Sequence, residues 1–120
     1  MPTTHLPTAD ALSDQAYRLA ADQTLSLIEQ TIDRWLEEDT VDVDCARSGG
    51  MLTLTLPDRS QVIVNTQPPL KELWIAARSG GYHFRWEGGQ NWLDTKSARP
   101  FMDVLGECLS QQSGQALSIR

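Results

Sequence analysis

The sequence predicts an α+β fold, a two-layer sandwich in which an N-terminal and a C-terminal helix pack on one face of an antiparallel β-sheet. Apolar residues recur at helical spacing near both ends of the chain. Between them, short segments with a period of two are separated by glycine-containing turns. A length of 120 residues suits one domain with one modest core. We therefore expect a tail over residues 1–12 and a single domain over residues 13–120.

The first helix is predicted to run from Ser13, a suitable N-cap, to about Glu38. Its apolar residues recur at steps of three and four and form one stripe that can pack on a sheet. The stripe consists of Tyr17, Ala20, Ala21, Thr24, Ile28, Ile32 and Trp35. No apolar run approaches the roughly 20 residues that span a bilayer, and the first residues lack the layout of a signal peptide. We therefore expect a cytoplasmic protein.

The strands are predicted from the change to a period of two after Asp39. Val41, Val43 and Cys45 alternate with Asp42 and Asp44, which indicates one strand with an apolar and an acidic side. Further strands are predicted over residues 51–56, 61–66, 73–77, 82–86 and 91–94, with turns at 48–50, 57–60, 80–81 and 88–89. A last helix is predicted from Pro100 at its first position to a stop at Gly114, with Phe101, Leu105, Cys108 and Leu109 facing inward.

The charge of the chain is concentrated in one segment. The net charge is −6, and residues 29–44 contain seven acids and one base, so this segment alone accounts for it. We call these seven acids the acidic ridge: Glu29, Asp33, Glu37, Glu38, Asp39, Asp42 and Asp44. Such a field repels nucleic acids and anionic membranes, and it attracts cations or basic proteins. We expect neither nucleic acid nor membrane as a partner.

The spacing of the ridge leaves two interpretations open. Glu29, Asp33 and Glu37 form one row on the helix, and like charges at this spacing cost about 0.2–0.5 kcal/mol per pair. The row is either a solvated acidic face or a site for hard cations, because it offers only carboxylate oxygens. An EF-hand starting at Asp42 is excluded, since Ala46 and Arg47 stand where an oxygen ligand and glycine are required. Cys45 and Cys108 are isolated, so they suggest neither zinc nor a disulfide framework, and we expect both to be reduced and buried.

One stretch of the sequence resembles a known family. Residues 64–76 read VNTQPPLKELWIA and are followed by GGYHF at residues 80–84. This pattern resembles the signature of the frataxin family, in particular its bacterial members. The resemblance extends from residues 21–23 in the first helix, through residues 42–45 and 49–50, to residues 111–114 at the end of the last helix. Residues 1–12 lie outside it.

The resemblance implies a frataxin sandwich that binds iron (Fe²⁺/Fe³⁺) weakly on the ridge, with other divalent cations as further ligands. Its metal positions fall on Glu29, Asp33, Asp42 and Asp44, and Glu37, Glu38 and Asp39 fill the junction between helix and strand. Gln30 and Arg34 stand where acids are common in the family, which implies fewer bound ions. The implied role is in iron-sulfur cluster assembly, through docking of the ridge on the cysteine desulfurase and contact with the scaffold machinery. A monomer is expected without metal.

The resemblance also assigns a second contact surface. Trp74 alternates with Leu73 and Ile75 along its strand. Because tryptophan side chains are mostly buried, the residue type alone favours a core position. In frataxins the matching Trp lies on the exposed sheet surface with the amides that match Asn65 and Gln67, so the resemblance implies a partner-binding patch. His83 is interpreted as a solvent-facing structural residue.

No catalytic constellation is found, and we expect a protein that is not an enzyme. Two other functions remain open. One is a metal-independent acidic protein that inhibits a basic enzyme directly. The other is an iron-oxidising protein, a ferroxidase.

Overall fold

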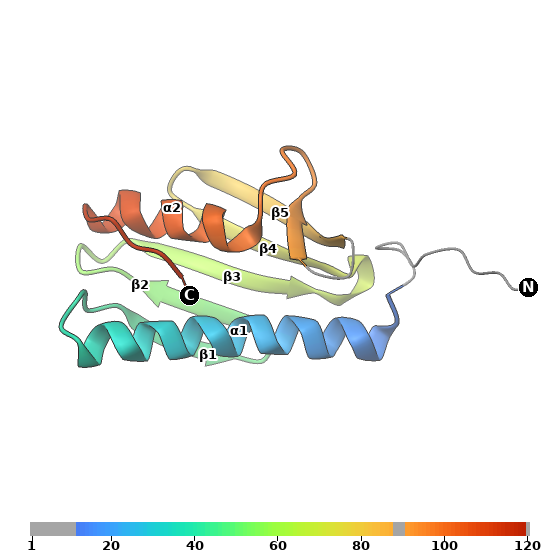
Figure 1. Cartoon of the computed structure of the whole chain (residues 1–120), viewed down its shortest axis with the longest axis horizontal. Helices are drawn as coiled ribbons and strands as arrows, with labels where there is room; N and C mark the ends of the chain where they lie inside the picture. Colours follow the sequence, from blue (N-terminus) through green and yellow to red (C-terminus); the bar gives the residue numbers. More distant parts are fainter. Residues whose placement is uncertain (1–11, 88–90, 120) are drawn as a thin grey trace, which may run out of the picture.

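The computed structural model describes residues 12–87 and 91–119 (Figure 1). Within them, helix α1 (Asp14–Glu37) is followed by the strands, and helix α2 (Phe101–Ser113) closes the domain. The strands are β1 (Asp44–Ser48), β2 (Met51–Thr55), β3 (Gln61–Gln67), β4 (Glu72–Ala77), β5 (Gly80–Glu87) and β6 (Asn91–Asp94), with the 3₁₀ turn η2 (Pro68–Leu70) before β4. Residues 1–11 of the predicted tail (residues 1–12) and the predicted turn at 88–89 lie outside the described residues.

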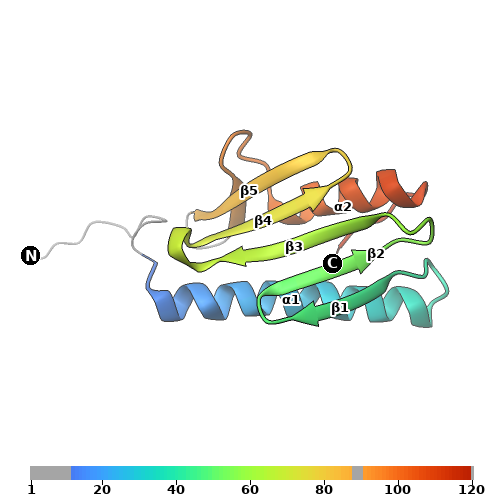
Figure 2. The same cartoon turned by 180° about the vertical axis from the view of Figure 1, so that it is seen from behind.

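The strands form one sheet in the order of the sequence, and each neighbouring pair is antiparallel. Both helices lie on the same face of this sheet, as Figure 1 shows, and the view from behind in Figure 2 shows the strands uncovered. The predicted fold class is therefore confirmed. We call the uncovered side the open face.

The core lies between the helices and the inner side of the sheet. Alternate strand residues such as Leu54, Val64 and Ile75 are fully buried there, as the period of two predicted. The predicted stripe of α1 is buried against them, apart from Ala20, which is half-buried. Leu25 and Thr31 are also buried and were not part of the predicted stripe. Burial of one large apolar side chain contributes about 1.5–3 kcal/mol, so this interface dominates the stability of the domain.

Both ends of α1 have the hydrogen bonds that such ends require. The Ser13 hydroxyl accepts from the Ala16 amide at 3.0 Å, which confirms the predicted N-cap. At the other end, the Thr40 amide donates to the Trp35 carbonyl and the Asp39 amide to that of Leu36. This is a Schellman motif with Asp39 in the left-handed region, at φ 57°. Asp39 therefore ends the helix as well as carrying charge.

Two strand boundaries lie more than one residue from their predicted positions. The first strand begins at Asp44, because residues 41–43 lie outside the ladder, although Val43 is buried as the alternation required. Gly80 and Gly81 belong to β5, where they pair with Ala77 and Ala76, so residues 78–79 make the turn. A two-residue turn suffices to join β4 and β5.

The last helix also differs at its start. Pro100 is the N-cap of α2 rather than its first helical residue, with ψ at 143°. Gly114 ends the helix at φ 76°, as predicted. Both cysteines are free, but only Cys108 is buried and Cys45 is half-buried. No helix in the described part of the chain is long and apolar enough to cross a membrane.

Candidate functional site

The acidic ridge follows the second half of α1, the bend after it and the start of β1. All of its carboxylates are exposed except that of Glu29, which is half-buried. Glu37 and Glu38 stand at the C-terminal end of α1, where the partial negative charge of the helix dipole disfavours acids by about 0.3–1 kcal/mol each. Arg34 is the basic residue in this last turn. The arrangement therefore works against helix stability, as the row of like charges indicated.

An arginine that sequence reasoning missed reaches the ridge from β1. Arg47 Nη1 donates to Glu29 Oε1 at 2.9 Å, and Arg47 Nη2 bonds Asp22. Arg47 shares its side of β1 with Cys45, which is the side that faces α1. The first acid of the ridge is therefore partly neutralised by an ion pair. The two partners are 18 residues apart, and no local spacing could reveal their contact.

The pKa of the Cys45 thiol is affected by the negative charge of the ridge. Burial, together with the carboxylates of Glu29 and Asp33, raises the pKa of its thiol to about 11, against a smaller opposing effect of Arg47. The thiol is therefore protonated at neutral pH, and it is a poor metal ligand in that form.

The structure divides the ridge between two sides of β1. Asp44 pairs with Thr55, which alternates with the buried Leu54, so Asp44 lies on the open face of the sheet. Glu29 and Asp33 lie beside the opposite side of β1, and Asp42 lies in the unpaired segment before it. Among the residues that the structure describes, no three His, Cys, Asp or Glu side chains converge on a point that could hold a metal ion. The donors suit hard cations, but bound water would have to complete their coordination.

A second candidate surface lies on the open face. The register places Trp74 between Asn65 and His83, and Glu72 between Gln67 and Arg85. We call these six residues the Trp74 patch: Asn65, Gln67, Glu72, Trp74, His83 and Arg85. The register places Trp74 on the open face, as the resemblance implied. Its side chain is half-buried there, so it is less exposed than a free surface residue.

The indole of Trp74 is held by its neighbours. Its ring stacks on that of His83, with centroids 4.0 Å apart and planes at 7°. Its Nε1 donates to Glu72 Oε1 at 2.8 Å. His83 is exposed, as expected, but it also forms the platform for the aromatic anchor. The sequence signal was available, since Trp74 and His83 lie on neighbouring predicted strands, but only the register makes them a pair.

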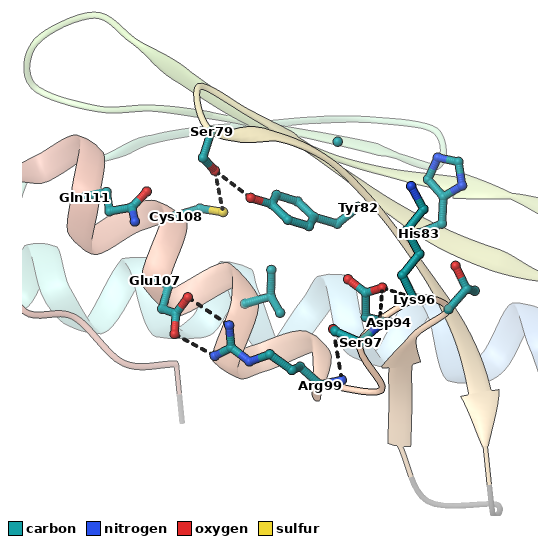
Figure 3. Close-up of a pocket in the computed structure, with 13 residues that line it drawn as sticks. Ser79, Tyr82, His83, Asp94, Lys96, Ser97, Arg99, Glu107, Cys108 and Gln111 are labelled. Carbon is teal, nitrogen blue, oxygen red and sulfur yellow. Dashed lines mark hydrogen bonds and ion pairs between the residues drawn. The ribbon is translucent and has the colours of Figure 1, made fainter.

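A pocket opens between β5 and α2 with a volume of 460 Å³ (Figure 3). At one end, the Ser79 hydroxyl lies 2.7 Å from the Tyr82 hydroxyl and 3.9 Å from Cys108 Sγ. Burial raises the pKa of the Cys108 thiol, which disfavours a nucleophilic thiolate. On the helix side, Arg99 and Glu107 satisfy each other in a two-pronged pair at 3.0 and 2.5 Å. The pocket was not predicted, and its polar groups largely bond one another.

Comparison with known proteins places the chain in a family. The frataxin-like domain family matches residues 10–115, which is most of the chain. This chain belongs to the frataxin family. The iron-sulfur cluster assembly protein CyaY of Polaromonas sp. is 44% identical over 106 residues, covering 88% of this chain and 90% of that protein. CyaY of Verminephrobacter eiseniae is 45% identical, covering 88% and 96%. The sequence-based assignment to this family is confirmed.

Solved structures agree on the frataxin fold. The frataxin of Psychromonas ingrahamii superposes with a TM-score of 0.78 at 30% identity, covering 90% of this chain and 98% of that one. A trimeric frataxin from the yeast Saccharomyces cerevisiae, complexed with ferrous iron, superposes with a TM-score of 0.67 at 22% identity, covering 96% and 94%. At that identity the yeast protein supports the fold alone.

Proposed function

We propose that this frataxin-family protein is an iron-binding regulator of iron-sulfur cluster assembly, an iron chaperone that docks its acidic ridge on the cysteine desulfurase. The bacterial relatives are named as iron-sulfur cluster assembly proteins, and a yeast frataxin was solved with ferrous iron. The observation that carries the proposal is the exposed ridge, which lies in a segment, residues 29–44, whose charge of −6 equals the net charge of the whole chain. In this role the protein binds and regulates, and it catalyses no reaction of its own.

Iron is held weakly in this proposal. The ridge positions Glu29, Asp33, Asp42 and Asp44, with the junction acids Glu37, Glu38 and Asp39, offer hard oxygen donors that suit Fe²⁺ and other divalent cations. Because these donors do not converge in the described part of the chain, each ion would keep much of its water. Weak, exchangeable binding suits a protein that carries iron to a partner better than it suits a protein that keeps iron as a resident cofactor.

Docking is proposed to use both surfaces. The ridge supplies long-range attraction to a basic partner, and the Trp74 patch, including Asn65 and Gln67, supplies short-range contacts. Asp44 and Trp74 share the open face, and the strand register places them about 20 Å apart at ordinary strand spacings. An interface of standard size buries about 800 Å² on each partner and can cover both. A single desulfurase or scaffold surface therefore suffices, with this chain acting as a monomer when metal is absent.

A metal-independent inhibitor is the second candidate. The Arg47 ion pair occupies Glu29, and the remaining acids are spread from α1, through the bend after it, to Asp44 on the open face. Both features favour a surface that meets a basic partner over one that gathers a metal ion. In this case the desulfurase would respond to the protein equally with and without iron.

The deciding experiment is desulfurase turnover with and without this protein at several iron concentrations. We expect the effect of the wild type to depend on iron, and the triple variant Asp33→Asn, Asp42→Asn and Asp44→Asn to lose that dependence. The control Asp103→Asn removes one exposed acid of α2 that is not part of the ridge, and it should keep the dependence on iron. An effect independent of iron in every variant would favour the inhibitor. Oxygen consumption during iron addition tests the ferroxidase alternative.

A further inference from the structure

Glu72 is a buried carboxylate on the face of the sheet that no helix covers. Its exposure is only 5%, although it alternates with Leu73, whose side chain faces the helices. Removing a carboxylate from water is costly unless hydrogen bonds and an opposite charge compensate for the loss. Glu72 therefore has to be explained by what it contacts.

Its two oxygen atoms have different partners. Oε1 accepts the indole N–H of Trp74 at 2.8 Å, and Oε2 accepts a guanidinium N–H of Arg85 at 2.9 Å. The Arg85 side chain is 43% exposed, so it covers the carboxylate while still reaching solvent. A charged acceptor makes a stronger hydrogen bond than a neutral one. The Glu72 carboxylate thus links the Trp74 indole to the Arg85 guanidinium within the Trp74 patch.

The backbone of Glu72 is also fixed, from the opposite side of the sheet. The Tyr17 hydroxyl of α1 donates to the Glu72 carbonyl at 2.7 Å and accepts from the Gln67 amide at 3.1 Å. Tyr17 is 2% exposed, so this hydroxyl lies in the core. Glu72 and Gln67 are cross-strand partners, and one buried side chain therefore holds both.

We propose that Glu72 is a positioning residue that fixes the Trp74 indole for docking. The indole is held at two places, by the Glu72 hydrogen bond at Nε1 and by the His83 ring on one face. A side chain held in this way loses less conformational freedom when a partner binds, and that gain appears as affinity. This inference rests on the proposed docking through the Trp74 patch.

The hydrogen bond from Trp74 Nε1 to Glu72 is tested on the protein alone, without any partner. The chain has four tryptophans, and Trp74→Phe identifies the Trp74 indole N–H among their NMR signals. We expect Glu72→Leu to speed hydrogen exchange of this N–H at least about fivefold, whereas Glu72→Gln, which keeps an acceptor, retains most of the protection. The Trp92 indole, which donates to Thr24, is the internal control and should not change. Unchanged exchange at Trp74 in a folded Glu72→Leu protein would overturn the proposal.

The link to docking is tested by a double-mutant cycle on affinity for a purified bacterial cysteine desulfurase. We expect Glu72→Leu to weaken binding about three- to tenfold, which corresponds to the loss of one hydrogen bond, and Glu72→Gln to restore most of it. In a Trp74→Phe background, which lacks the N–H, Glu72→Leu should have almost no further effect. Equal losses in both backgrounds would show a role of Glu72 that does not pass through the indole, and would overturn the proposal.

Failure of the proposed docking gives a different result. In that case Trp74→Phe and Trp74→Ala would bind the desulfurase like the wild type, while the exchange of the Trp74 N–H would still respond to Glu72→Leu. That outcome would overturn docking at the Trp74 patch, while the hydrogen bond between Glu72 and the Trp74 indole would still be supported.

Discussion

The acidic ridge and the Trp74 patch differ in how the fold holds their side chains. Most ridge carboxylates are exposed, and Glu29 is the member that an ion pair ties to a neighbouring strand. In the patch, Glu72, Trp74, His83 and Arg85 hold one another by hydrogen bonds and ring stacking. Exposed side chains that carry charge of one sign attract a partner at long range and tolerate changes in geometry. Side chains held in one arrangement contribute to binding only when the partner is in contact. The two regions therefore suit two successive stages of docking.

The largest effect is expected from reversing charge at the helix end. Glu37→Lys with Glu38→Lys changes the net charge from −6 to −2 and should weaken desulfurase binding at least about 100-fold, because steering and contact are lost together. Asp39 is left unchanged, since lysine is disfavoured at its left-handed backbone position.

The control for this variant is Glu87→Lys with Asp103→Lys, which makes the same change in net charge at exposed positions away from the ridge. It should weaken binding far less. Wild-type affinity should also fall as salt rises, because exposed charges are screened over about 8 Å at physiological ionic strength. Equal losses in both double variants would show that only net charge matters and that the ridge is not a docking surface.

Trp74→Ala sharpens the comparison at the other surface. We expect about a 30-fold loss of desulfurase affinity, as for an aromatic anchor at an interface. The free energy of unfolding should fall by less than the roughly 3–5 kcal/mol that removal of a core tryptophan costs. Chemical denaturation gives the stability, and Trp92→Ala, at 4% exposure, serves as the core reference. A stability loss equal to that of the reference would place Trp74 with the core.

Cys45 allows the field of the ridge to be measured. Because burial and the nearby Glu29 and Asp33 raise the pKa of its thiol to about 11, its alkylation at pH 8 should be about 100-fold slower than that of a thiol with a pKa of 9. Asp33→Asn removes one of these charges and should speed the reaction about threefold. The measurement uses a Cys108→Ser background, so that a single thiol reacts. A rate unaffected by Asp33→Asn would mean that the Asp33 carboxylate does not contribute to the raised pKa of the thiol.

The smallest effect is expected in the stability of the metal-free protein. Replacing Asp33, Asp42 and Asp44 with asparagine should raise Tm by about 2–5 °C, because repulsion worth some tenths of a kcal/mol per pair is removed. The same variant should lose most of the Tm increase that Fe²⁺ gives the wild type, since a ligand bound only by the folded state stabilises it by mass action. A lower Tm without metal would mean that these carboxylates stabilise the fold.

The sequence by itself determined the layers and most element positions. The helical period of Tyr17, Ile28 and Trp35 and the period of two in Leu52 and Leu54 are dictated by backbone geometry, which any local window displays. The charge segment was equally visible, because composition does not depend on folding. The errors were local ones: the strand that starts at Asp44 and the glycines that lie inside β5. At residues 41–43 the apolar alternation occurs without the pairing that defines a strand, and at Gly80 and Gly81 residues typical of turns are paired within a strand.

Only the tertiary structure decided which side chains meet. The Arg47–Glu29 pair joins a strand to a helix, and Trp74 stacks on His83 through a register that no periodicity fixes. The burial of Glu72 is the clearest case, since its position in the alternation predicts the open face and its charge predicts solvent. Its burial follows from Arg85 and Trp74 closing over it, and such contacts depend on strand pairing rather than on the neighbours of a residue in the chain.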